Sequence, residues 1–226
     1  KQMDKFIIEG GNPLNGEIAI SGAKNAVLPI MVATLIVPGE YRLNNVPELR
    51  DTYTMKRLLE MVGAIVNFEK NIMDIDTTYC DTPIAPYELV KTMRASFYVL
   101  GPFLSRFNHA EVSLPGGCAW GPRPVDFHIK AFEKMGAKIS LDGGYILGEG
   151  KLSAAKIHFK IPSVGATGNV LMGCVNLDDT IIITNAAMEP EIVDLCNFLS
   201  QLGVKFKGIG TSTLTVQGIN ESKKVF

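Results

Sequence analysis

The sequence predicts an α/β domain in which one unit of two helices and a hairpin occurs three times around a pseudo-threefold axis. Two observations carry this prediction. Nearly all-apolar segments alternate along the chain with shorter amphipathic segments, and each amphipathic segment ends at a glycine. Those glycines lie 73 and 67 residues apart, and the segment starting at Gly22 aligns with the one starting at Gly165. Such repeats bury their apolar faces only against one another, so three of them form one core.

The composition excludes several classes of protein. The 226 residues are 46% hydrophobic and carry a net charge of −1, with no basic block longer than two residues. A sizeable core is therefore expected, and binding to nucleic acid or to a membrane surface has no electrostatic support. The longest apolar run, residues 26–37, is too short to span a bilayer and lies too far inside the chain for a signal peptide.

The cysteines and histidines indicate the compartment and the absence of a metal site. The four cysteines form no C-x-x-C pair and the three histidines show no spacing typical of metal ligands. We therefore expect reduced thiols in a cytoplasmic protein that needs no metal and no cofactor.

The chain begins with two expected strands, residues 5–9 and 16–20, which are separated by a turn. Both lie outside the repeats, and an isolated two-stranded hairpin is only marginally stable in water. We therefore expect residues 1–20 to be the first strands of a second domain that is otherwise absent. The three-repeat domain then covers residues 21–218, and residues 219–226 are a linker back toward the absent domain.

Each repeat begins with a helix and a strand. The helix is apolar on all sides, which is typical of a helix buried all round. A short strand rich in apolar residues follows each helix. The expected helices are residues 26–35, 95–104 and 170–175, and the expected strands are residues 41–46, 110–114 and 180–184.

Each repeat ends with an amphipathic helix and a hairpin. The glycine after the last helical turn is the residue best able to adopt a positive φ, so Gly63, Gly136 and Gly203 predict helix C-caps. Turn residues in the following segments predict antiparallel hairpins. The hairpins are expected over residues 64–76, 137–147 and 204–216.

A loop over residues 114–126 interrupts the second repeat. Its three prolines and three glycines forbid a regular helix or a central strand. It contains Cys118 and, five positions on, Arg123. A nearby cation lowers the pKa of a thiol, and a guanidinium suits a planar anion, so these two residues are candidates for a reactive site. A surface loop with an inert cysteine is the alternative.

Further polar residues stand at the starts of the three apolar helices. Lys24 and Asn25 lie at the first start, Arg94 at the second, and Ser163 and Val164 at the third. A helix N-terminus offers unpaired N–H groups and partial positive charge, so threefold packing would gather anion-binding groups. The alternatives are solvated cations for Lys24 and Arg94, and helix caps for Asn25 and Ser163.

Several motifs together resemble the UDP-N-acetylglucosamine 1-carboxyvinyltransferase family. The motif around Cys118 is the most specific of them, whereas the helix starts alone would be weak. The matching segments are SGAKNA at 21–26, MRAS at 93–96, PGGCA at 115–119, GPRPVD at 121–126, SVGAT at 163–167 and EPEIVD at 189–194.

The resemblance implies an inside-out α/β barrel in which each of two domains contains three βαβαββ repeats with pseudo-threefold symmetry. It implies transfer of an enolpyruvyl group from phosphoenolpyruvate to the 3′-hydroxyl of UDP-N-acetylglucosamine, with release of phosphate. This reaction is the first committed step of peptidoglycan synthesis, and so of cell-wall biogenesis, cell shape and cell division. The implied partners are these two small-molecule substrates.

The resemblance also implies roles for individual residues. Cys118 matches the family's proton donor, which forms an adduct with phosphoenolpyruvate and is alkylated by fosfomycin. Lys24 and Arg123 match contacts to the phosphate of phosphoenolpyruvate, and Asn25 lies near the reacting centre. Cleavage of the C–O bond needs cations on the departing phosphate and an acid at the methylene carbon. The implied nucleotide-sugar residues are Arg94, Arg123, Pro124, Val125, Asp126, Phe127, Ser163 and Val164.

The sequence departs from the family pattern in two ways. Ile161 stands where members often have a basic contact to the diphosphate. The second domain, which supplies an aspartate for the sugar hydroxyl and further arginines, is absent, so we expect this chain alone to be inactive. One alternative is a half-enzyme that binds a nucleotide sugar without turnover. Another is the enolpyruvyl transferase of the shikimate pathway, which uses no cysteine at this loop.

Overall fold

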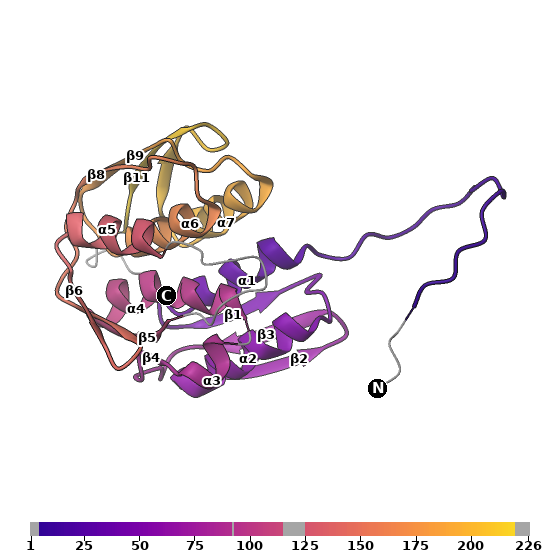
Figure 1. The fold of residues 1–226 in the computed structure, drawn as a ribbon, viewed down its shortest axis with the longest axis horizontal. Helices are drawn as coiled ribbons and strands as arrows, with labels where there is room; N and C mark the ends of the chain where they lie inside the picture. The colour runs from indigo at the N-terminus through magenta and orange to yellow at the C-terminus, as the bar shows by residue number, and fades with distance from the viewer. Residues whose placement is uncertain (1–4, 92, 115–124, 220–226) are drawn as a thin grey trace.

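The chain folds into three units, each with its own sheet (Figure 1). The computed structural model describes residues 5–91, 93–114 and 125–219, with only the backbone of Arg94. The buried helices α1, α4 and α6 pack inside, and the three sheets lie outside them. The predicted threefold repeat is therefore confirmed.

The first unit contains a three-stranded antiparallel sheet in the order β1-β3-β2. Its turn places Lys70 and Asn71 at φ values of 50° and 61°, which matches a tight hairpin. In chain order the unit consists of α1 (Lys24–Ala33), β1 (Glu40–Leu43), α2 (Arg50–Val62), β2 (Ile65–Glu69) and β3 (Ile72–Asp76).

The second unit has a four-stranded sheet in the order β4-β5-β7-β6, in which β4 runs parallel to β5. Its apolar segment is a 3₁₀ helix, η1, that continues into α4. In chain order the unit consists of β4 (Ile84–Ala85), α3 (Tyr87–Val90), η1 (Arg94–Val99), α4 (Leu100–Phe107), β5 (His109–Ser113), α5 (Asp126–Lys134), β6 (Lys138–Asp142) and β7 (Tyr145–Glu149).

The third unit repeats this arrangement with the strand order β10-β11-β9-β8, and β8 again runs parallel to its neighbour. Both later units therefore follow the predicted βαβαββ order. Within the described residues, nothing pairs with the outer edge of β1, where the other two sheets have their parallel strand. In chain order the unit consists of β8 (Lys156–His158), α6 (Val164–Gly173), β9 (Thr180–Thr184), α7 (Pro190–Gln201), β10 (Lys205–Lys207) and β11 (Thr213–Gln217).

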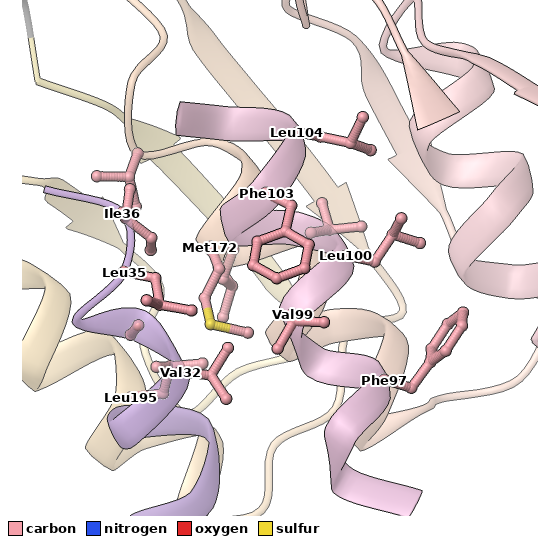
Figure 2. Packing of buried hydrophobic residues seen from close by; sticks show 14 of the residues in the cluster. Val32, Leu35, Ile36, Phe97, Val99, Leu100, Phe103, Leu104, Met172 and Leu195 are labelled. Carbon is pink, nitrogen blue, oxygen red and sulfur yellow. The ribbon is translucent and has the colours of Figure 1, made fainter. Parts of the chain in front are cut away.

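The core forms where the three apolar helices meet. Figure 2 shows Val32 of α1, Phe103 of α4 and Met172 of α6 pointing toward one another. All three side chains are fully buried. Burying each side chain of this size contributes about 1.5–3 kcal/mol, so the meeting of the three units adds to the stability of the whole fold.

The first apolar helix lies within two residues of its predicted bounds, whereas the second and third differ more. The third apolar helix begins at Val164 and not at residue 170, and its small residues permit close packing there. A Cβ on Gly168 would lie 2.9 Å from the ring of Tyr98. The second apolar helix changes from η1 to α4 near Pro102, which has no N–H to donate to the carbonyl of Tyr98.

The predicted strands at residues 5–9 and 16–20 are wrong. Residues 5–23 contain no strand and extend away from the body as an arm (Figure 1). A strand requires a hydrogen-bonded neighbour, and the described residues provide none for this segment. The arm leaves large apolar side chains exposed, namely Phe6, Ile7, Ile8, Leu14, Ile18 and Ile20.

Candidate functional site

The predicted site residues that the structure describes stand at or beside the N-terminal ends of helices, and these helices contact one another in series. Helix α1 packs against η1, η1 packs against α6, and α6 packs against α5. The helices that carry Lys24, Ser163 and Val164 are therefore linked to one another through η1. Cys118, Arg123 and Pro124 lie outside the described residues, and so does the side chain of Arg94.

At the start of α1, Lys24 forms an ion pair with Asp51 in the first turn of α2. Its Nζ lies 3.2 Å from Oδ2 of Asp51, and the two side chains are 49% and 30% exposed. An ion pair this exposed contributes at most about 1 kcal/mol, so the ammonium remains available to a stronger anion. Asn25 is exposed beside it.

The chain enters α1 through a close approach to the loop after β1. The N–H of Gly22 donates to Oδ1 of Asn45 at 3.2 Å. A Cβ on Gly22 would overlap the carbonyl oxygen of Asn45, so the position requires glycine. This contact fixes the position of the backbone just before Lys24, which lies two residues later.

The start of α5 presents a carboxylate with one unsatisfied oxygen. Oδ2 of Asp126 accepts a hydrogen bond from Nζ of Lys130 at 3.2 Å. Its Oδ1 is buried and has no partner among the described residues. Buried acceptors are normally hydrogen-bonded, so this oxygen is suited to a donor from a ligand or from the neighbouring loop. Val125 directly precedes the helix, and Phe127 packs partly against the core.

The start of α6 is capped by Ser163. Its Oγ accepts a hydrogen bond from the N–H of Ala166 at 3.3 Å, so the interpretation as a helix cap is confirmed. The N–H groups of Val164 and Gly165 belong to the first turn, where no intrahelical carbonyl is available. Together with the helix dipole, they make this end of α6 favourable for an anion.

Behind these helix starts lies a buried polar contact that sequence reasoning missed. Asn169 of α6 is fully buried, and its Nδ2 donates to Nδ1 of His128 and to the carbonyl of Phe97, both at 2.9 Å. Its Oδ1 accepts from the N–H of Gly101 at 2.7 Å. The sequence feature that could have indicated this contact is the amide of Asn169, which stands within an otherwise apolar helix.

The ring of His128 is partly buried by its neighbours. It stands edge-on to the ring of Phe97, with centroids 4.9 Å apart. Burial lowers the pKa of His128 to about 4, although the carboxylate of Asp126 opposes this shift. The imidazole is therefore neutral near pH 7.

The three described cysteines are all buried. Burial raises the pKa of Cys80 to about 11 and that of Cys196 to about 12, and it also raises the pKa of Cys174. The thiolate is the nucleophilic form, so none of these three cysteines competes with a loop thiol at neutral pH.

A cavity of about 260 Å³ lies near the C-terminal ends of α4 and α6. One of its walls is Arg106, whose guanidinium donates to the carbonyls of Leu35, Thr77 and Cys80, each at 3.0 Å. The guanidinium thus satisfies carbonyls at a helix end and a loop, and its role is structural. The lining residues are Leu104, Ser105, Arg106, Asn108, Lys151, Leu152, Asn176 and Leu177.

Two features are absent from the described residues. No group of three or more histidine, cysteine or acidic side chains in the described ranges is placed to hold a metal ion. Among the helices described, none has the length and apolar character needed to cross a membrane.

Comparison with curated proteins gives relatives over almost the whole chain. A UDP-N-acetylglucosamine 1-carboxyvinyltransferase from Chlorobaculum parvum is 49% identical over 227 residues, which cover 99% of this chain and 54% of that protein. The protein of the same name from Chloroherpeton thalassium is 52% identical over 223 residues, covering 97% and 52% of the two chains. This chain therefore spans about half the length of the curated relatives that it matches.

Solved structures show the same fold. The enolpyruvyl transferase NikO from Streptomyces tendae superposes with a TM-score of 0.80 at 21% identity, over 94% of this chain and 50% of that one. The EPSP synthase from Acinetobacter baumannii gives a TM-score of 0.73 at 16% identity, over 90% and 47%. The EPSP synthase family, described as 3-phosphoshikimate 1-carboxyvinyltransferase, matches residues 8–226. The fold and this match lead to one conclusion: the chain belongs to the EPSP synthase family.

Proposed function

We propose that this chain takes part in the transfer of an enolpyruvyl group from phosphoenolpyruvate to the 3′-hydroxyl of UDP-N-acetylglucosamine, with release of phosphate. The observation that carries the proposal is about 50% identity, over nearly all of the chain, to proteins named for that activity. The reaction would be the first committed step of peptidoglycan synthesis, and the compartment would be the cytoplasm. Because the chain spans about half of these relatives, the complete activity requires a second half.

The nucleotide sugar would lie along the starts of α5, α6 and η1. The N–H groups of Val164 and Gly165 would receive diphosphate oxygens, with Arg94 and Arg123 supplying positive charge. The buried Oδ1 of Asp126 lacks a donor among the described residues and would accept a hydrogen bond from the N–H of the uracil ring. Pro124, Val125, Phe127 and Ser163 would complete this wall.

Phosphoenolpyruvate would lie nearer the start of α1. The ammonium of Lys24 and the guanidinium of Arg123 would hold the departing phosphate, because both stabilise its negative charge. Asn25 stands beside Lys24 and would face the reacting centre. Cys118 would protonate the methylene carbon, and it would be the residue alkylated by fosfomycin.

The exposed arm would complete a second domain. Residues 5–20 expose large apolar side chains. A second half, corresponding to the part of the relatives that this chain does not match, would cover them. The cleft between the two halves would orient the substrates, an effect that accounts for about 7–11 kcal/mol of barrier lowering in well-oriented reactions. A chain with one wall of this cleft would bind the nucleotide sugar without turnover.

Two measurements test the proposed function. Titration calorimetry should show binding of UDP-N-acetylglucosamine but not of shikimate 3-phosphate, and the reverse preference would contradict the assignment. Phosphate release from phosphoenolpyruvate should be undetectable with this chain and rapid with a full-length relative. Release by this chain within tenfold of the relative, abolished by Cys118→Ala, would show that the second half is dispensable.

A further inference from the structure

One buried amide joins three of the helices that carry the candidate site. Asn169 belongs to α6, and its side chain contacts Phe97 of η1, Gly101 of α4 and His128 of α5. It is fully buried, and all three hydrogen bonds are 2.7–2.9 Å long. Leaving one such buried donor or acceptor without a partner costs more free energy than its hydrogen bond contributes. These hydrogen bonds therefore fix how the helices pack against one another.

The surrounding main chain fixes which way the amide points. The N–H of Gly101 can only donate, so the atom facing it must be the oxygen of Asn169. The carbonyl of Phe97 can only accept, so the atom facing it must be the amide nitrogen. The same nitrogen contacts Nδ1 of His128 and therefore donates to it.

This orientation determines the tautomer of His128. Because Nδ1 accepts a hydrogen bond, the neutral ring carries its proton on Nε2. The Nε2 edge lies against the first turn of α6, where a Cβ on Gly165 would be 3.4 Å from Nε2. No described residue accepts a hydrogen bond from Nε2, so an N–H donor remains at the helix end that carries Ser163 and Val164.

We propose that Asn169 is a positioning residue of the nucleotide-sugar site. Asn169 holds His128 as the Nε2–H tautomer, and it fixes the starts of α5 and α6 relative to each other. The inference rests on the proposed function for the identity of the ligand. Asn169 itself is shielded from that ligand, so its effect passes through His128 and through the spacing of the helix starts. A residue of this kind changes affinity without touching the substrate.

The chain offers a matched control for this proposal. Asn176, which follows α6, also donates from its Nδ2 to main-chain carbonyls, those of Ser105 at 3.2 Å and Ile36 at 3.4 Å. It lies at the opposite end of α6 from Ser163. Asn169→Thr and Asn176→Thr both remove an amide that bridges segments, but only the first removes the donor to His128.

The experiment combines nitrogen NMR with ligand binding on the 226-residue chain at pH 7. The ¹⁵N shifts of His128 should show a protonated Nε2 in the wild type and in the control variant Asn176→Thr. Asn169→Thr should give a mixture of tautomers, and its Kd for UDP-N-acetylglucosamine should rise about tenfold. The Kd of Asn176→Thr should stay within about twofold of the wild type, at a comparable melting temperature.

Several outcomes would overturn the inference. A protonated Nδ1 in wild-type His128, or an unchanged tautomer in Asn169→Thr, would show that Asn169 does not orient the ring. Equal losses of affinity in the two variants would show a structural role only. If Asn169→Thr does not fold, Asn169→Asp provides the second test, because a carboxylate accepts from His128 and should move the proton to Nδ1. If the wild type binds no UDP-N-acetylglucosamine, the proposed function fails, while the tautomer measurements still decide the role of Asn169.

Discussion

Nζ of Lys24 lies 3.2 Å from Oδ2 of Asp51, so an exposed ion pair joins the start of α1 to the first turn of α2. Removing this pair should affect binding more than folding. We expect Lys24→Ala to lower the free energy of unfolding by less than about 1 kcal/mol, because water screens the pair. The same variant should lose the protection that phosphoenolpyruvate gives against alkylation of Cys118.

Urea unfolding and alkylation rates with and without phosphoenolpyruvate measure these two effects. Lys130→Ala is a suitable control, because Lys130 also forms an exposed ion pair, with Asp126, within α5. A loss of more than about 2 kcal/mol in Lys24→Ala would contradict the prediction that the pair matters less for folding than for binding, since roughly 1 kcal/mol is the upper range for exposed pairs.

The close approach of α4 to α6 should not tolerate a methyl group at Gly101. A Cβ there would overlap the carbonyl oxygen of Asn169, and it would also lie 2.8 Å from Oδ1 of that residue. We expect Gly101→Ala to lower the free energy of unfolding by about 1–3 kcal/mol, measured by denaturant titration. Gly10→Ala is the control, since a Cβ at Gly10 would meet nothing within 4 Å and should leave stability unchanged.

Cys118 should be alkylated well before the other three cysteines. At pH 8 a thiol with a pKa of about 11, such as Cys80, is only about 0.1% thiolate. Peptide mapping after brief treatment with iodoacetamide should therefore show label at residue 118 first. In urea all four cysteines should react at similar rates, and preferential labelling of Cys80, Cys174 or Cys196 in the folded chain would contradict the prediction.

His128 should make the fold less stable in acid. Its pKa is lowered to about 4 in the folded chain, whereas an unfolded histidine titrates near 6.5, so the unfolded state takes up the proton first. The stability is complete above pH 6.5 and is lost as the pH falls toward 4. A shift of this size corresponds to a loss of up to about 3 kcal/mol.

Urea unfolding at pH 7 and pH 4.5 tests this dependence. His128→Asn should be less stable at pH 7 but should lose less stability between the two pH values than the wild type does. His158→Gln, at an exposed histidine on β8, should keep the dependence of the wild type. Identical slopes for the wild type and His128→Asn would show that His128 is accessible to protons in the folded chain.

The sequence by itself determined the helices, helix caps and hairpins that recur in the three units. The glycines at 63, 136 and 203 were predicted as helix C-caps, and their φ values are 105°, 96° and 101°. The sequence also placed the three hairpins, the order of elements in each unit and the burial of the apolar helices. These features depend on neighbours a few residues apart, whose periodicity and conformational preferences can be read along the chain. The motifs around Lys24, Cys118 and Ser163 are short stretches of neighbouring residues too, and they gave the resemblance to the relatives that are about 50% identical to this chain.

Only the tertiary structure decided which distant groups meet. Asn169 contacts His128 across 41 positions and Phe97 across 72, and nothing in either local sequence specifies those contacts. Residues 5–9 have the composition of a strand but form none, because a strand exists only where another strand accepts its hydrogen bonds. The third apolar helix was predicted over residues 170–175, yet it begins at Val164, where its neighbours pack closely against its small residues. Pairing and close packing are properties of the assembled core, and they override local preference wherever the two disagree.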